Sequence, residues 1–191
     1  SHVAQTTYLF GDAGFERVNF IRTNKHNSNE IRSTQVFFYG NNLRATDARV
    51  TEDTALTLQL TFRGSVNMGK VTATSYLNST LGQTLLSATH LVGEAGFERV
   101  NTQENFSRNV LRTRTDFLYG DLGLNASDKR VTEDTALRKQ MTYRIKPAPQ
   151  ASASAGALPV QILQSELQLG GDAGFEKANL QINFKTNGLI R

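Results

Sequence analysis

The chain has 191 residues, of which 38% are hydrophobic and 20% charged, a balance typical of a globular protein rather than a disordered one. It contains no cysteine, which excludes disulfides, thiolate metal sites and cysteine nucleophiles. The net charge is +4, but acidic and basic residues are interspersed. This pattern predicts a mixed, solvated surface and no nucleic-acid partner, with a polysaccharide or another anionic surface as the alternative partner. No apolar run is long enough for a transmembrane helix.

Strands are predicted in most parts of the chain, but none is predicted over residues 93–110. Alternation of apolar and polar residues is clearest over residues 56–62, where Leu56, Leu58, Leu60 and Phe62 are predicted to form one buried face. The other predicted strands cover residues 6–10, 15–22, 32–39, 70–77, 85–92, 111–119, 137–145, 160–169 and 180–184. Many of these segments are rich in Thr, Val and Phe, which β-structure favours.

Short glycine- and asparagine-containing segments predict the turns between these strands. Gly-Asp-Ala-Gly at residues 11–14 predicts a tight turn or bulge, because glycine adopts backbone conformations that other residues avoid. Residues 41–42 and 120–121 predict further turns. Residues 51–56 predict a single helical turn with Thr51 as its N-cap.

Two motifs recur in the same order. The first, here called the turn motif, is Gly-Asp-Ala-Gly-Phe-Glu-Arg-Val-Asn at residues 11–19, with close copies at 93–101 and 171–179. The second, here called the loop motif, is Arg-Val-Thr-Glu-Asp-Thr-Ala-Leu at residues 49–56 and 130–137. A unit of roughly 80 residues is therefore written twice and then begun a third time.

These observations predict an all-β fold, an internally duplicated antiparallel β-sandwich or barrel with a C-terminal β-hairpin. The predicted organisation is a first repeat unit, a second unit, a Pro/Ala/Ser-rich linker or loop and the start of a third unit, at residues 1–87, 88–146, 147–159 and 160–191 respectively. Two architectures remain open: two β-domains in series, or one closed or sandwiched sheet in which residues 168–191 pair back on the first unit. We expect Ser1 and His2 to be a remnant ahead of a piece of a larger precursor.

No motif indicates catalysis. The histidines His2, His26 and His90 are isolated from one another and do not recur between units, so we predict no catalytic triad and no imidazole metal site. Gly-x-x-Gly in the turn motif is not followed by the residues of a phosphate-binding loop. We therefore predict a protein that is not an enzyme and needs no organic cofactor.

Two acidic clusters are the only candidate metal ligands. They consist of Asp47, Glu52 and Asp53 in the first unit and of Asp128, Glu133 and Asp134 in the second. Calcium prefers such oxygen ligands, so a calcium site is one alternative. Arg49 and Arg130 lie within the clusters and favour the other alternative, an ion-paired turn. The recurring glutamates of the turn motif, Glu16, Glu98 and Glu176, are predicted to pair with neighbouring basic side chains on the strand surface.

The general character of the chain predicts a structural or adhesive protein. Repeated, cysteine-free β-units are typical of fibres, fimbriae, adhesin stalks and biofilm matrix, and sheet edges permit self-association by strand complementation. We therefore expect an extracellular or cell-surface location, in a bacterium. The alternative is a β-barrel that binds a small apolar or anionic ligand, lined by Phe38, Tyr39, Tyr119 and arginines.

Overall fold

The computed structural model describes residues 3–74, 84–146, 159–185 and 190. The predicted linker at 147–159 therefore lies outside the described residues except for its last position, and the last three residues of the strand predicted at 70–77 also lie outside them. Among the described residues there is no α-helix, only the single 3₁₀ turn η1 (Met68–Lys70). The all-β prediction is confirmed.

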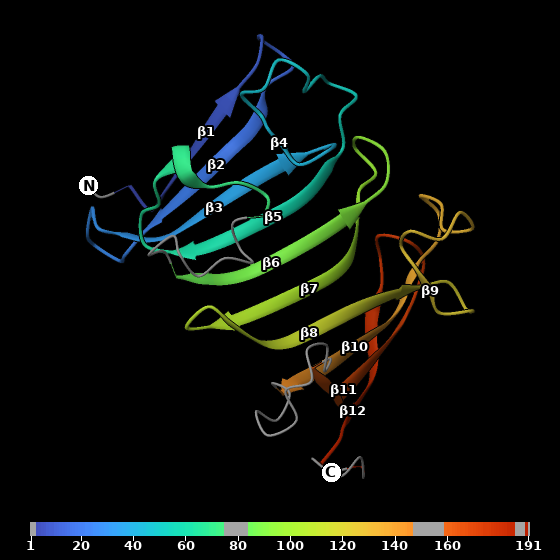
Figure 1. Ribbon diagram of the computed structural model, residues 1–191. Coiled ribbons are helices and arrows are strands. Elements are labelled where there is room, and N and C mark those ends of the chain that lie inside the picture. Colours follow the sequence, from blue (N-terminus) through green and yellow to red (C-terminus); the bar gives the residue numbers. More distant parts are fainter. Residues whose placement is uncertain (1–2, 75–83, 147–158, 186–189, 191) are drawn as a thin grey trace, which may run out of the picture. The chain divides into compact units, whose positions relative to one another are not determined.

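The strands form one open antiparallel sheet of twelve strands (Figure 1). The first six strands are β1 (Gln5–Phe10), β2 (Arg17–Asn24), β3 (Ile31–Tyr39), β4 (Leu43–Arg44), β5 (Leu56–Arg63) and β6 (Leu85–Val92). The remaining strands are β7 (Arg99–Ser107), β8 (Val110–Tyr119), β9 (Leu124–Asn125), β10 (Leu137–Lys146), β11 (Val160–Gly170) and β12 (Lys177–Asn183).

Hydrogen bonding follows the order β1-β2-β3-β5-β6-β7-β8-β10-β11-β12, with β4 paired to β3 and β9 to β8. The path has two ends, β1 and β12, so the sheet is not closed into a barrel. In the closed alternative, residues 168–191 would pair back on the first unit. Instead, the described strands of the C-terminal hairpin pair with β10 and with each other.

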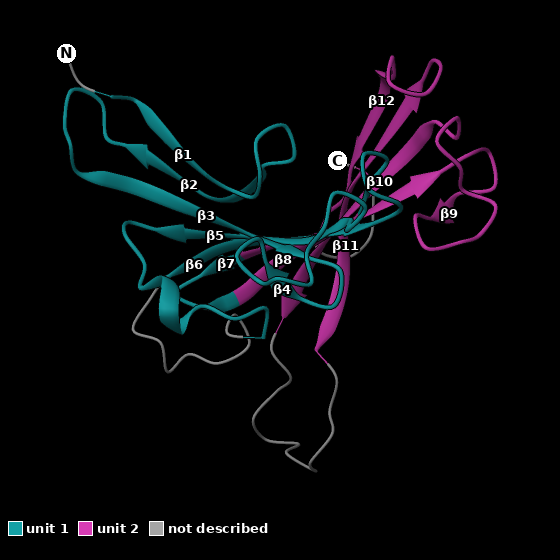
Figure 2. Ribbon diagram, turned by 90° about the horizontal axis from the view of Figure 1, so that it is seen from above, with its two compact units in different colours: residues 1–100, 106–110 teal, residues 101–105, 111–191 magenta. Residues whose placement is uncertain are grey.

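The chain divides into two compact units (Figure 2). One contains residues 1–100 and 106–110, and the other contains residues 101–105 and 111–191.

The core of the first unit lies on both faces of its sheet. On one face, Val36, Phe38, Leu60 and Phe62 are almost completely buried, and residues 66–73 pack over them. On the other face, a second cluster of buried residues is formed by Phe37, Tyr39 and Ala45. Alternate side chains of β3 therefore enter different clusters, as the two-residue period of a strand requires.

A bulge changes the face on which one predicted core residue lies. The register of β3 and β5 shifts between Phe38 and Tyr39, so that Phe38 faces Leu58 and Tyr39 faces Leu56. The extra residue, Thr57, donates its hydroxyl to the backbone oxygen of Phe38. The prediction that Leu56 shares a face with Leu58, Leu60 and Phe62 is wrong, because the bulge moves Leu56 to the second cluster.

Two local predictions in the first unit are also wrong. The strand predicted at 70–77 is replaced, where the structure describes it, by the end of η1 and a segment without strand pairing. Val71 and Ala73 of this segment are buried in the core instead of forming a ladder. The helical turn predicted at residues 51–56 is a simple turn, closed by the Thr54 N–H, which donates to the Thr51 oxygen over 3.1 Å.

The second unit repeats this construction with fewer buried residues. Strand β10 pairs with β8 on one side and with β11 on the other, and its register on β8 shifts between Leu137 and Lys139, the counterpart of the bulge in the first unit. The polar Lys139 interrupts the apolar face of β10, and its ammonium group lies 3.0 Å from the Glu166 carboxylate on β11. A cross-strand ion pair therefore replaces a core contact at this position.

Candidate functional site

The three turn motifs each join an antiparallel pair of strands, β1 to β2, β6 to β7 and β11 to β12. Their first glycine has a positive φ in every copy, +126° at Gly11, +135° at Gly93 and +113° at Gly171. A Cβ atom at these positions would lie 2.6–2.8 Å from a backbone oxygen across the turn. Only glycine fits such a turn without displacing the backbone. The predicted role of this motif as a strand-joining turn is confirmed.

The glutamate of the turn motif folds back onto its own turn. The N–H of Gly14 donates to Oε2 of Glu16 over 3.0 Å, and the N–H of Gly96 donates to Oε2 of Glu98 over 3.1 Å. This bond fixes the direction of the carboxylate and leaves its second oxygen, Oε1, available for another donor.

The loop motif is held in one conformation by its own hydrogen bonds. Within it, the Thr51 N–H donates to the Thr54 hydroxyl over 2.9 Å, and Thr132 and Thr135 make the same bond at the same distance. The loop is also tied to the end of the preceding strand, where the Gly40 N–H donates to the Ala55 oxygen. Two copies of the motif thus adopt the same conformation.

Each loop motif is joined to the turn motif that follows it in the chain. The N–H of Leu56 donates to Oε1 of Glu98 over 2.9 Å, and the N–H of Leu137 donates to Oε1 of Glu176 over 2.9 Å. Both bonds are partly buried and have an ionised acceptor, which makes them stronger than neutral hydrogen bonds. The prediction that these glutamates serve neighbouring basic side chains is therefore corrected: they bind backbone N–H groups of the preceding repeat.

Sequence reasoning missed this contact because its partners are about half a repeat apart. The available signal was the recurrence of a glutamate at the same place in all three turn motifs, together with a loop motif upstream of two of them. Glu16 has the same turn geometry as Glu98, but among the described residues no loop motif lies before it. Its side chain is exposed, whereas those of Glu98 and Glu176 are half-buried.

The residue after the glutamate contacts the loop motif of its own repeat. A terminal nitrogen of Arg17 donates to the Thr51 oxygen over 3.1 Å, and the guanidinium carbon lies 5.6 Å from the centroid of the Tyr39 ring. Burial raises the pKa of the Tyr39 hydroxyl, an effect that the Arg17 charge opposes. The first loop motif is consequently held from two sides, by Arg17 of its own turn motif and by Glu98 of the next.

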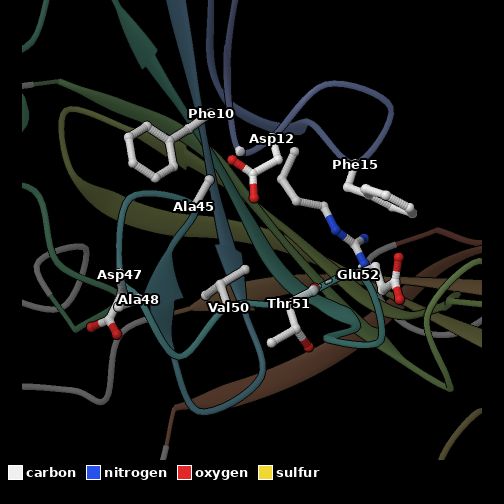
Figure 3. A pocket seen from close by; sticks show the side chains of 11 residues that line it. Phe10, Asp12, Phe15, Ala45, Asp47, Ala48, Val50, Thr51 and Glu52 are labelled. Carbon is white, nitrogen blue, oxygen red and sulfur yellow. Dashed lines mark hydrogen bonds between the residues drawn. The ribbon is translucent and has the colours of Figure 1, made fainter.

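An open groove of about 460 Å³ lies between the first turn motif and the loop (Figure 3). Phe10, Phe15 and Val50 supply apolar lining, and the charged side chains of Asp12, Arg17 and Glu52 also line the groove. The exposed Phe15 ring shows that this side of the turn is not covered by the described residues of the chain.

The acidic residues considered for calcium are arranged as ion-paired or exposed groups. Asp47 binds Arg49 with both carboxylate oxygens, at 2.9 and 2.8 Å, and Asp128 binds Arg130 in the same way. These side-chain hydrogen bonds lower the pKa of Asp47 and of Asp128 to about 2. The four remaining candidates are exposed on the loop motifs: Glu52, Asp53, Glu133 and Asp134. Among the residues that the structure describes, no three acidic or histidine side chains form a group able to hold a metal ion.

The residues considered for a ligand-binding interior are core residues. Phe38 and Tyr39 are 1% and 4% exposed and point into opposite clusters, and Tyr119 is 5% exposed. Of the histidines, His26 is exposed in the β2–β3 turn and His90 lies in β6 opposite Leu58.

The fold and these contacts define an open antiparallel sheet assembled from repeated hairpins and loops, in which the second and third turn-motif hairpins each bind the loop motif that precedes them in the chain. No protein-family model, curated protein or solved structure matches this chain. Within the described part of the chain, no helix has the length and apolar character needed to cross a membrane.

Proposed function

We propose that this chain is a non-enzymatic structural repeat protein of the bacterial cell surface or extracellular space, and that its sheet is lengthened by strands of other copies. The observation that carries the proposal is the open edge at β1. All six residues of β1 are exposed, and among the described strands β1 pairs only with β2, on one side. An unpaired edge presents backbone N–H and C=O groups that another strand can bind.

The opposite end of the sheet supports the same function. Strand β12 is also an edge strand, and all but one of its residues are exposed. Exposed apolar side chains lie on both edge strands, with Leu9 at 56% and Leu180 at 48% exposure. Natural sheets usually protect their edges with charges, prolines or covering segments, and β1 contains neither a charge nor a proline.

Measurement of molar mass against protein concentration tests this function. Size-exclusion chromatography with light scattering is expected to show masses that rise above the monomer as concentration increases, and electron microscopy is expected to show elongated particles. Leu9→Lys places a charge on the β1 edge and is expected to shift the protein toward the monomer. Leu122→Lys is the matched control, because Leu122 is 74% exposed in the turn between β8 and β9 and belongs to neither edge strand. A protein that remains monomeric at every concentration would contradict the proposal.

A further inference from the structure

We propose that β1 pairs with β1 of a second copy of this chain, antiparallel and about a two-fold axis at Thr7, so that two sheets join into one. The inference rests on the proposed growth of the sheet at its edges, and it names the partner strand and its register. Among the described strands β1 pairs only with β2, and a second copy brings the same unpaired edge. The strand that each edge needs is therefore supplied by the other copy's edge.

The backbone of β1 directs alternate residues toward the open side. The Asn24 N–H of β2 donates over 2.9 Å to the oxygen of Ala4, the residue directly before β1. Successive residues of a strand direct their N–H and C=O groups to opposite sides, so every second residue after Ala4 faces β2. The residues between them direct both groups outward, and they are Gln5, Thr7 and Leu9.

The equivalent edge of each later hairpin is covered by an antiparallel strand. Thr89 of β6 occupies the position of Thr7 relative to its turn motif and lies opposite Gln59 of β5. Leu167 of β11 occupies this position in the third hairpin and lies opposite Gln140 of β10. An edge of this geometry therefore accepts an antiparallel partner, and β1 is the copy that has none among the described strands.

One symmetric register pairs the whole of β1. In this register Thr7 lies opposite Thr7 of the second copy, and Gln5 lies opposite Leu9. Each of these becomes a hydrogen-bonded pair of an antiparallel ladder, in which the two residues exchange N–H···O bonds. Sliding the strands by two residues, the smallest slip that keeps their faces, leaves either Gln5 or Leu9 opposite a residue outside β1.

The side chains of β1 fit this pairing. The strand contains no charged residue, so no like charges meet across the axis. On one face Leu9, which is 56% exposed, would lie beside Gln5. On the other face Tyr8, whose ring is stacked on Phe20 with the centroids 4.1 Å apart, would lie beside Thr6. The added strand would remove apolar surface of Leu9 and Tyr8 from water, which favours association.

Strand β12, the other edge strand, is a poorer partner for β1. The N–H of Phe184, directly after β12, donates to the Gln164 oxygen of β11, and Phe184 also forms a bridge with Ile190 on its other side. Residues of the chain itself thus begin to pair along this edge. Strand β12 also begins with the cationic Lys177, for which β1 offers no carboxylate. These differences favour the β1–β1 junction, which leaves a β12 edge at each end of the joined sheet.

A cysteine at the axis tests the two-fold register. The chain contains no cysteine, so Thr7→Cys can form a disulfide only between two copies. The paired Cα atoms would lie about 5.5 Å apart, a separation that a disulfide spans. After oxidation, Thr7→Cys is expected to run as a covalent dimer on a non-reducing gel. The matched control Thr46→Cys, at an exposed position in the turn after β4, is expected to run as a monomer.

Three results of this experiment would overturn the inference. They are the absence of a covalent dimer of Thr7→Cys, equal crosslinking of Thr7→Cys and Thr46→Cys, and crosslinking of Thr7→Cys only when it is mixed with Gln181→Cys. The last result would show that β1 pairs with β12, the strand that contains Gln181.

Opposite charges at residue 7 test the same pairing without a covalent bond. Thr7→Lys and Thr7→Glu each place like charges opposite one another, and each is expected to raise the dimer dissociation constant by about 10-fold or more. An equimolar mixture of the two variants is expected to restore the dimer, because the lysine of one copy then lies opposite the glutamate of the other. Thr46→Lys is the matched control and should leave the dissociation constant unchanged. Sedimentation velocity measures all of these, and a mixture that associates no better than either variant alone would overturn the inference.

The outcome is distinguishable from that of the proposed function. A chain that crosslinks through Thr7→Cys but never exceeds the mass of a dimer would retain the two-fold pairing and refute continued growth of the sheet. A chain that forms larger assemblies without crosslinking through Thr7→Cys would refute the two-fold pairing and retain the proposed function. A chain that is monomeric at every concentration would refute both.

Discussion

Glu98→Ala is the most direct perturbation of the contact between successive repeats. The substitution removes the acceptor of the Leu56 N–H, which is partly buried, and of the Gly96 N–H, which is exposed and can bind water instead. A buried donor left without a partner costs about 1–3 kcal/mol. We therefore expect a destabilisation of about 2 kcal/mol, which corresponds to a fall in melting temperature of roughly 4–8 °C for a chain of this size.

Glu16→Ala is the built-in control for this experiment. Glu16 makes the same bond to its turn, through Gly14, but has no loop-motif partner among the described residues. The difference between the two variants thus isolates the bond to Leu56. Thermal unfolding by circular dichroism gives the overall cost, and hydrogen exchange by NMR should show faster exchange of the Leu56 amide in Glu98→Ala alone. Equal destabilisation by both variants, or unchanged protection of Leu56, would refute the reasoning.

Three further results are expected. Gly93→Ala should destabilise the chain by roughly 1–3 kcal/mol from backbone strain, because φ is +135° and the new Cβ would lie 2.6 Å from the Phe97 oxygen; chemical denaturation measures this. Phe62→Ala should cost about 3–5 kcal/mol by emptying a site in the first core cluster, measured in the same way. The Asp47 carboxyl should titrate with a midpoint of about 2 by NMR, because Arg49 binds its ionised form.

Each of these results has its own check. Gly96→Ala, where an added Cβ would meet nothing within 4 Å, should cost less than Gly93→Ala. Leu122→Ala, at a 74% exposed position, should change the free energy of unfolding by less than about 0.5 kcal/mol. Arg49→Gln should return the Asp47 midpoint toward its usual value. Since the folded-state pKa of Asp47 is lowered, its contribution to stability is present above about pH 4 and is lost as the pH falls toward 2.

Local patterns in the sequence were sufficient to predict most strands and turns. The strand predicted at 85–92 coincides with β6, and the segment at 111–119 differs from β8 by a single residue at its start. Period-two alternation and glycine turns are properties of neighbouring residues, so they can be read without knowledge of the partners. The repeat itself further predicted that corresponding elements recur.

Features that depend on distant partners were not predictable in this way. The bulge at Thr57 is set by pairing with β3, and it moves Leu56 to another face although the sequence alternates without interruption. Likewise, Val71 and Ala73 are of residue types that strands favour, but they pair with none of the described strands and are buried over the core instead. Whether a sheet closes or stays open depends on the pairing of its end strands, and alternation within each strand carries no information about this.

The adjacent glutamate and arginine of the turn motif explain how a repeat of this kind maintains its register. Glu98 binds the loop motif of the preceding repeat, whereas Arg17, one position further along an equivalent motif, binds the loop motif of its own repeat. A one-residue slip in the ladder would remove the glutamate from the Leu56 N–H and turn every side chain of the slipped strand to the opposite face. The hydrogen bonds of the turn motif thus favour the same strand register as the burial of alternate side chains. Both internal copies make this contact at 2.9 Å and have the same strand register. The alignment of each repeat is therefore specified by contacts with its nearest neighbour in the sheet.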